Sequence, residues 1–118
     1  MSISNYSEGI MLATLPATVY VKLHIGDPGE AGTSNAAANT TRKAVTLDAA
    51  VSGSRTSSTA AAWSAGEVTT TETYSHASLW DASVAGNCLF TGALGARVAV
   101  TAGSTFTIAA TGLVVTLD

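Results

Sequence analysis

The stretch LHIGDPGEAGTSNAAAN, Leu23 to Asn39, holds the residues whose spacing most invites a chemical interpretation. Glycines recur at positions 26, 29 and 32 around Asp27 and Glu30, and Asn35 follows them. A glycine-rich loop can cradle a phosphate, but nucleotide-binding fingerprints need a following helix or a P-loop lysine, and the segment has neither. The acids also lack the regular spacing of a calcium-binding loop. Asp27 and Glu30 are therefore predicted to be turn residues.

Three side chains could act as a base or a nucleophile: His24, His76 and Cys88. A serine hydrolase needs a base, an orienting acid and an exposed nucleophile, and no G-x-S-x-G turn accompanies either histidine. His24 alternates outward on a strand and is predicted to face solvent. Cys88 has no neighbouring base and is predicted to be a small buried residue. One cysteine and two separated histidines cannot supply a zinc tetrad. We expect a non-enzyme with no catalytic residues, no metal site and no cofactor.

An aromatic ligand face is the alternative kind of site. Tyr74, His76 and Trp80 alternate on one side of an expected strand. Half-buried packing is the expected role of His76, and adsorption to a host-surface glycan is the ligand-binding alternative. Trp63 and Trp80 lie far apart in the sequence, and in a chain with few large side chains both are expected to anchor the core.

Composition excludes several classes of function. Charged residues make up 11% of the 118 residues, whereas a charged share of about 25% is usual. The net charge is −3. The few basic residues are not clustered, so nucleic-acid binding is not expected. No apolar run approaches the roughly 18 residues that cross a bilayer, so no membrane association is expected. A single cysteine fits folding in a reducing cytosol, and the first residues lack a secretion-signal pattern. The weakly hydrated surface suits packing against neighbouring chains, which predicts a homo-oligomer.

The length predicts a single domain over residues 1–118. Residues 1–15 are predicted to form an N-terminal arm with a short helix, capped by Ser2 or Ser4 and ended by Pro16. Its apolar side chains fall on one face at helical spacing: Ile3, Tyr6, Ile10 and Met11.

After this arm the hydrophobic period changes to two. In TVYVKLHI, one face is predicted to carry Val19, Val21, Leu23 and Ile25, and the other Tyr20, Lys22 and His24. The DPG turn closes this strand, and residues 26–41 are predicted to form an extended loop.

Further strands are predicted from short alternating segments at residues 43–49, 61–64, 73–80 and 88–94, followed by three short C-terminal strands. Residues 52–60 are predicted to be a polar loop. This spacing predicts a mainly β fold, an antiparallel β-sandwich of jelly-roll or immunoglobulin-like type with a short N-terminal helix.

Three blocks of the chain resemble a family of small tailed-bacteriophage virion proteins. Residues 23–29, LHIGDPG, and 41–45, TRKAV, are similar to that family's LHTGDPG and ARQAV words. Residues 75–94, SHASLWDASVAGNCLFTGAL, resemble its GLWDAASGGNLLF pattern, and residues 100–118 resemble its AGDTFTIPAGALTVTLD ending. Members are usually labelled tail-fibre or structural proteins, and the resemblance transfers no catalytic residue.

The resemblance implies a protein of the virion, made in the cytoplasm of the bacterial host. We expect a small surface module that binds other virion proteins, the major capsid or tail proteins. Capsid decoration is the first expectation, and a tail-fibre or tail-tip protein or a carbohydrate-binding module are the alternatives. Backbone groups of the glycine-rich loop are expected to bind neighbouring chains. The expected assembly contacts are Asp27, Pro28, Gly29, Glu30, Gly32, Ser34 and Asn35.

Overall fold

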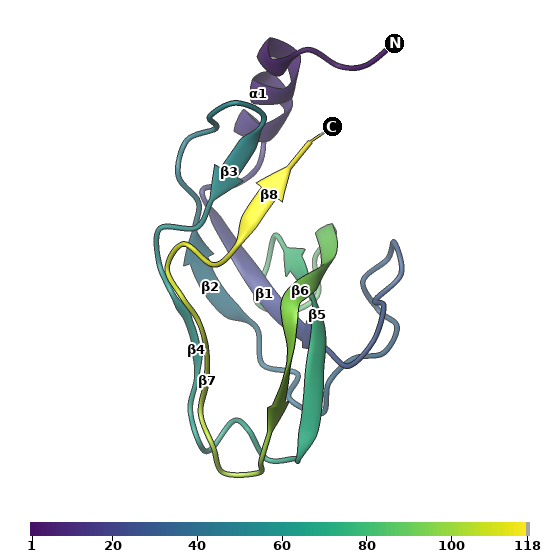
Figure 1. Cartoon of the computed structure of the whole chain (residues 1–118), viewed down its shortest axis with the longest axis vertical. Helices are drawn as coiled ribbons and strands as arrows, with labels where there is room; N and C mark the ends of the chain where they lie inside the picture. The colour runs from purple at the N-terminus through teal and green to yellow at the C-terminus, as the bar shows by residue number, and fades with distance from the viewer. Residues whose placement is uncertain (118) are drawn as a thin grey trace.

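A four-stranded antiparallel sheet forms one layer of the computed structural model, which describes residues 1–117 (Figure 1). Its strands lie in the order β2 (Lys43–Thr46), β1 (Thr18–His24), β5 (Glu72–Trp80) and β6 (Cys88–Val100). Two antiparallel ribbons form the second layer, β3 (Ser54–Thr56) with β8 (Val114–Thr116) and β4 (Ala61–Trp63) with β7 (Phe106–Ile108). With 42% strand and 8% helix, the prediction of a mainly β, antiparallel sandwich is confirmed.

The core lies between the layers and is built from alternate positions of the strands. In β1, Val19, Val21 and Leu23 are at most 1% exposed, as the alternation predicts. On the ribbon side, the ring centroid of Phe106 lies 5.6 Å from that of Trp63 and 5.0 Å from that of Tyr74. Tilted and edge-on aromatic packing at these distances adds to the stabilisation from burial alone.

The alternation predicted for β1 is wrong at its last two positions. The strand ends at His24, which is fully buried, whereas Ile25 is half exposed. The physical reason is the chain that follows: Ala36 pairs with His24 in an isolated bridge, and the Ile25 amide donates to the Asn35 carbonyl. The loop therefore folds back over His24 and covers it.

The prediction of two separate strands after residue 88 is also wrong, because β6 runs continuously for 13 residues. Tyr74 pairs with Val98 and His76 with Ala93, so residues 94–97 form a bulge opposite Ser75. Glycine inside a strand often marks such a bulge. Gly95 lies in this bulge and Gly92 lies just before it.

Residues 52–60 were predicted to be a polar loop, but they contain β3, which pairs with β8. Its central residue, Arg55, is 7% exposed. The guanidinium donates to the carbonyl oxygens of Asp48 (2.8 Å), Leu12 (2.9 Å), Leu15 (3.1 Å) and Leu47 (3.3 Å). Arg55 thus ties the end of the N-terminal helix to the segment after β2.

The N-terminal helix, α1 (Asn5–Ala13), is confirmed together with its predicted cap, because Ser4 Oγ accepts the Ser7 amide. Its orientation differs from the prediction. Glu8 and Leu12 are buried, and the expected apolar face (Tyr6, Ile10 and Met11) is exposed. Within residues 1–117, no helix is long and apolar enough to cross a membrane.

Replacing Arg55 by methionine is expected to lower the free energy of unfolding by about 3 kcal/mol, because several buried carbonyls lose a charged donor. Urea denaturation measures the change. Arg97→Met is the control, since Arg97 is exposed in the β6 bulge, and it is expected to change stability by no more than about 0.5 kcal/mol. Equal stability of the two variants would contradict the role of Arg55.

Candidate functional site

The loop of residues 26–41 projects beyond the end of β1 at the side of the sheet (right in Figure 1). Among the predicted assembly contacts, Pro28 and Gly32 are buried. The others are exposed: Asp27, Gly29, Glu30, Ser34 and Asn35. Five of the predicted contacts are therefore accessible to a partner on this loop. The two buried ones, Pro28 and Gly32, pack within the protein.

Backbone groups of Gly32, Ser34 and Asn35, which were expected to bind neighbouring chains, make hydrogen bonds within the chain. The Ser34 amide donates to the Pro28 carbonyl (3.0 Å), and the Gly32 amide donates to the Gly29 carbonyl (3.1 Å). The Asn35 carbonyl is taken by Ile25. What the loop offers a partner is therefore a preformed shape and its side chains.

A buried chain of hydrogen bonds holds the loop on the sheet. Because a carbonyl only accepts, His24 Nδ1 donates to the Ser34 carbonyl (2.9 Å). In the neutral imidazole, Nε2 is then the acceptor, and it receives the Ser78 hydroxyl (2.8 Å). The same hydroxyl oxygen accepts the Trp80 indole N–H (2.7 Å).

Burial sets the protonation state of His24. The side chain is fully buried, and desolvation lowers its pKa below the usual 6.5, against a smaller opposing effect from the Ser34 carbonyl. The prediction that His24 faces solvent is wrong. With both ring nitrogens engaged inside the protein, the neutral imidazole serves structure.

Trp80 is covered by two features of the chain. The residue is 6% exposed, and the Arg42 guanidinium lies 4.0 Å from the ring centroid. Arg42 also donates to the carbonyls of Ala82 (2.9 Å) and Ala85 (2.7 Å), which fixes the β5–β6 turn. At Gly32, with a φ of 69°, a Cβ would collide with Cys88 Sγ and approach Trp80. Only glycine meets both requirements there.

The predicted ligand face of Tyr74, His76 and Trp80 is not assembled as an open surface. Tyr74 is fully buried against Phe106, and burial raises its pKa, while His76 is half-buried. Neither Tyr74 nor Trp80 exposes a ring face on which a sugar could stack. Glycan binding at these residues stays a prediction and requires a rearrangement.

Cys88 is half-buried rather than a core residue, because it lies at the start of the edge strand β6. Burial raises the pKa of its thiol, which is the opposite of what an activated nucleophile needs. Among residues 1–117, no group of three His, Cys, Asp or Glu side chains could hold a metal ion.

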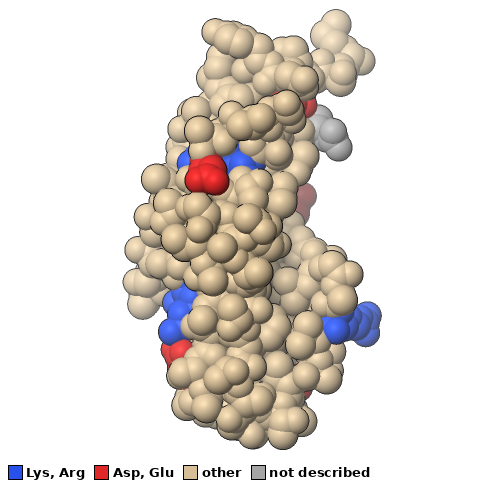
Figure 2. Space-filling model, turned by 60° about the vertical axis from the view of Figure 1, so that its left-hand side comes forward, with Lys and Arg blue, Asp and Glu red and all other residues tan. Residues whose placement is uncertain are grey.

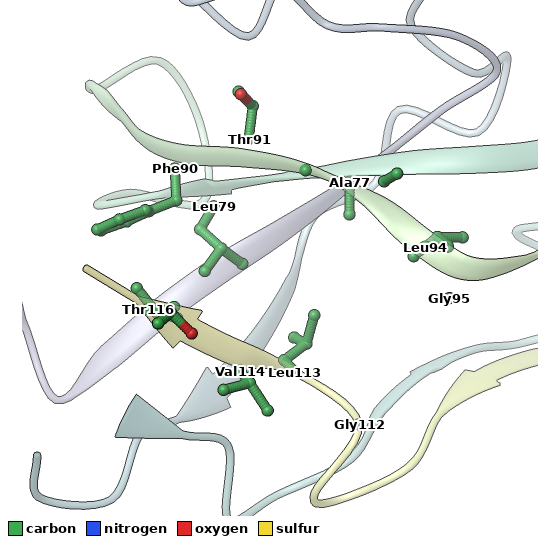
Figure 3. A pocket seen from close by; sticks show the side chains of 13 residues that line it. Ala77, Leu79, Phe90, Thr91, Leu94, Gly95, Gly112, Leu113, Val114 and Thr116 are labelled. Atoms are coloured by element: carbon green, nitrogen blue, oxygen red, sulfur yellow. The ribbon is translucent and has the colours of Figure 1, made fainter. Parts of the chain in front are cut away.

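A cavity of about 460 Å³ lies between β8 and the β5–β6 hairpin. Figure 3 shows Leu79 and Phe90 on the sheet side and Leu113, Val114 and Thr116 on the opposite side. None of the described residues that line it carries a titratable side chain. The cavity is a gap between the layers that offers no group for catalysis.

His24 and Arg42, the residues that hold the site, were not recognised from the sequence. His24 was placed on the wrong face of its strand. Arg42 lies in TRKAV, one of the words on which the family resemblance rests, and that position was the available signal.

A protein-family model described as "Podophage GP4 fiber I protein gp80" matches residues 3–116. The match therefore spans α1, all the strands and the loop of residues 26–41. No curated protein matches the chain.

The lowered pKa of His24 predicts a loss of stability in mild acid. Between that pKa and about 6.5, the unfolded chain binds more protons than the folded one, so the free energy of unfolding falls as the pH falls. His24→Gln is expected to flatten this dependence and to cost about 1–3 kcal/mol at neutral pH. Urea denaturation at a series of pH values from about 7.5 to about 5, a range that brackets the usual histidine pKa of about 6.5, measures both effects.

The matched control is His76→Gln, which leaves the hydrogen bonds of His24 in place and is expected to retain the acid-side fall. An unchanged pH profile in His24→Gln would show that His24 is not the group responsible.

Proposed function

The chain belongs to the family described as Podophage GP4 fiber I protein gp80, and from that membership we propose that it is a component of a phage tail fibre. Membership itself gives a structural role in a phage virion, in association with other virion components. We favour the fibre over capsid decoration, which was the first expectation from the sequence, because the family description names a fibre. The family match over residues 3–116 carries this proposal.

The geometry supports a role in attachment rather than catalysis. The molecule is elongated, with extents of 45 × 27 × 25 Å, so its ends and its projecting loop can contact different neighbours. Its one fully buried histidine is engaged at both ring nitrogens, and its thiol has a raised pKa. We therefore propose a non-enzymatic function.

The loop of residues 26–41 is the proposed contact with other virion proteins. Internal hydrogen bonds hold its shape, so binding orders few additional residues and loses little conformational entropy. Asp27 and Glu30 lie exposed on it, which favours a partner surface with basic or hydrogen-bond-donating groups. Repeated over the copies in a particle, modest contacts add up through avidity.

Immunogold labelling of purified particles tests the location. We expect gold at the tail, because a fibre component is attached there. Gold distributed over the shell would overturn the fibre proposal in favour of capsid decoration, and unlabelled particles that lack the chain by mass spectrometry would overturn both.

The double substitution Glu30→Arg/Ser34→Arg is expected to reduce incorporation into particles at least about tenfold, because it reverses the charge of the loop and adds bulk to it. Both side chains are exposed, so the thermal unfolding midpoint is expected to be nearly unchanged. Quantitative mass spectrometry of particles assembled with the variant measures incorporation.

Thr107→Arg is the matched control, because Thr107 is exposed on β7, on the ribbon layer away from the loop. It is expected to be incorporated normally. Equal incorporation of the loop variant and the control would exclude the loop as the contact.

A further inference from the structure

One end of the molecule carries an apolar surface that the chain itself does not cover. Tyr6 and Ile10 of α1 are 80% and 52% exposed, and Val51, in the segment before β3, is 70% exposed. We name Tyr6 and Ile10, with the groove that they help to line, the α1 face; Val51 is exposed in the neighbouring segment and does not line the groove. Apolar side chains gathered in this way on a surface mark an interaction site more often than scattered ones do.

The groove of the α1 face lies between α1 and residues 49–53 and has a volume of about 490 Å³. Small residues make most of its walls: Gly9, Ala13, Ala49, Ala50, Ser52 and Gly53. Nothing lies within 4 Å of where a Cβ on Gly9 would be, so another chain can approach the helix backbone closely there. Sites of about 300–1,000 Å³ hold drug-sized ligands, so side chains of a partner fit in this groove.

The α1 face also lacks charge. None of the described residues that line the groove is charged. The acid of the helix, Glu8, is buried toward Gly53, where a Cβ would collide with its carboxylate. On the side of the molecule that Figure 2 shows, the end that carries α1 displays almost no charged side chains. Two such faces can therefore meet without repulsion and without burying an unpaired charge.

We propose that the α1 face binds the α1 face of a second copy of this chain. The face carries protruding apolar side chains, Tyr6 and Ile10, directly beside an apolar groove, and an interface between two identical patches requires both on the same surface. Each copy then places its Tyr6 in the groove of the other. This second surface is distinct from the loop of residues 26–41.

The size of the face sets the expected affinity. The nine residues that line its groove are about a third to a half of the roughly 20–30 residues that each side of a standard interface contributes. We therefore expect association in the micromolar range rather than the nanomolar range.

Sedimentation equilibrium of the purified full chain, from low to high micromolar concentration, measures this association. We expect the mass to rise with concentration above the 11.8 kDa of one chain. Tyr6→Glu and Ile10→Glu are each expected to weaken the association at least about tenfold, because each buries a charge in an apolar contact.

Gly9→Gln separates docking from helix stability. Glutamine is a better helix former than glycine, and the site has room for it, so the thermal midpoint is expected to hold or rise. Its side chain fills the groove, so the association is expected to weaken at least about tenfold.

Val84→Glu is the matched control, because Val84 is 80% exposed in the turn between β5 and β6 and does not line the groove. It is expected to associate like the unmodified chain. A monomer at every concentration, or equal association of Gly9→Gln and the unmodified chain, would overturn the proposal. These outcomes concern the isolated chain and do not depend on the immunogold result, so the two proposals can fail separately.

Discussion

The buried imidazole of His24 is the constraint on which the position of the loop of residues 26–41, the proposed contact surface, depends. It lies at the end of β1, pairs in register with His76 of β5, and bonds Ser78 across the sheet and Ser34 in the loop. A neutral histidine satisfies this arrangement with one donor and one acceptor. The sheet register and the loop position are thus fixed by the same ring, so the loop is a preformed part of the sandwich.

Two arginines and one glycine hold further irregular segments in place. Arg42 stacks on Trp80 and binds two carbonyls of the β5–β6 turn, and Gly32 lets the loop approach Trp80 and Cys88. Arg55 donates to the carbonyls of Leu12 and Leu15 and so holds the end of α1. Both arginines donate to carbonyl oxygens that a turn or a helix end leaves without a regular backbone partner. The irregular segments of the chain are held by a few polar anchors rather than by large apolar side chains.

Local patterns predicted most of the elements, because alternation and capping act over a few residues. The buried face of β1, the Ser4 cap, and the strands around residues 61–63 and 72–80 were predicted correctly for that reason. His24 was misplaced because its partners lie 10 and 54 residues further along the chain. β3 was missed because its partner strand β8 is even more distant in the sequence, with Arg55 paired to Val115. The shared face of Tyr6, Ile10 and Met11 was recognised as apolar, but no local pattern shows whether such a helix face turns inward or remains open.

Most lysine and arginine side chains bind groups within the chain, and this affects which charges the protein can offer to a binding partner. The chain has five lysine and arginine residues. Arg55 is buried, Arg42 covers Trp80, and Lys43 pairs with Glu67 at 2.7 Å. Only Lys22 and Arg97 remain, and Lys22 lies 5.8 Å from the Trp80 ring. The surface is therefore poorer in available positive charge than the composition suggests, so the charge that it offers a neighbour is mainly the negative charge of exposed acids such as Asp27 and Glu30. Contacts made through such exposed acids are weak singly, and they suit a component that is held in place by several neighbours at once.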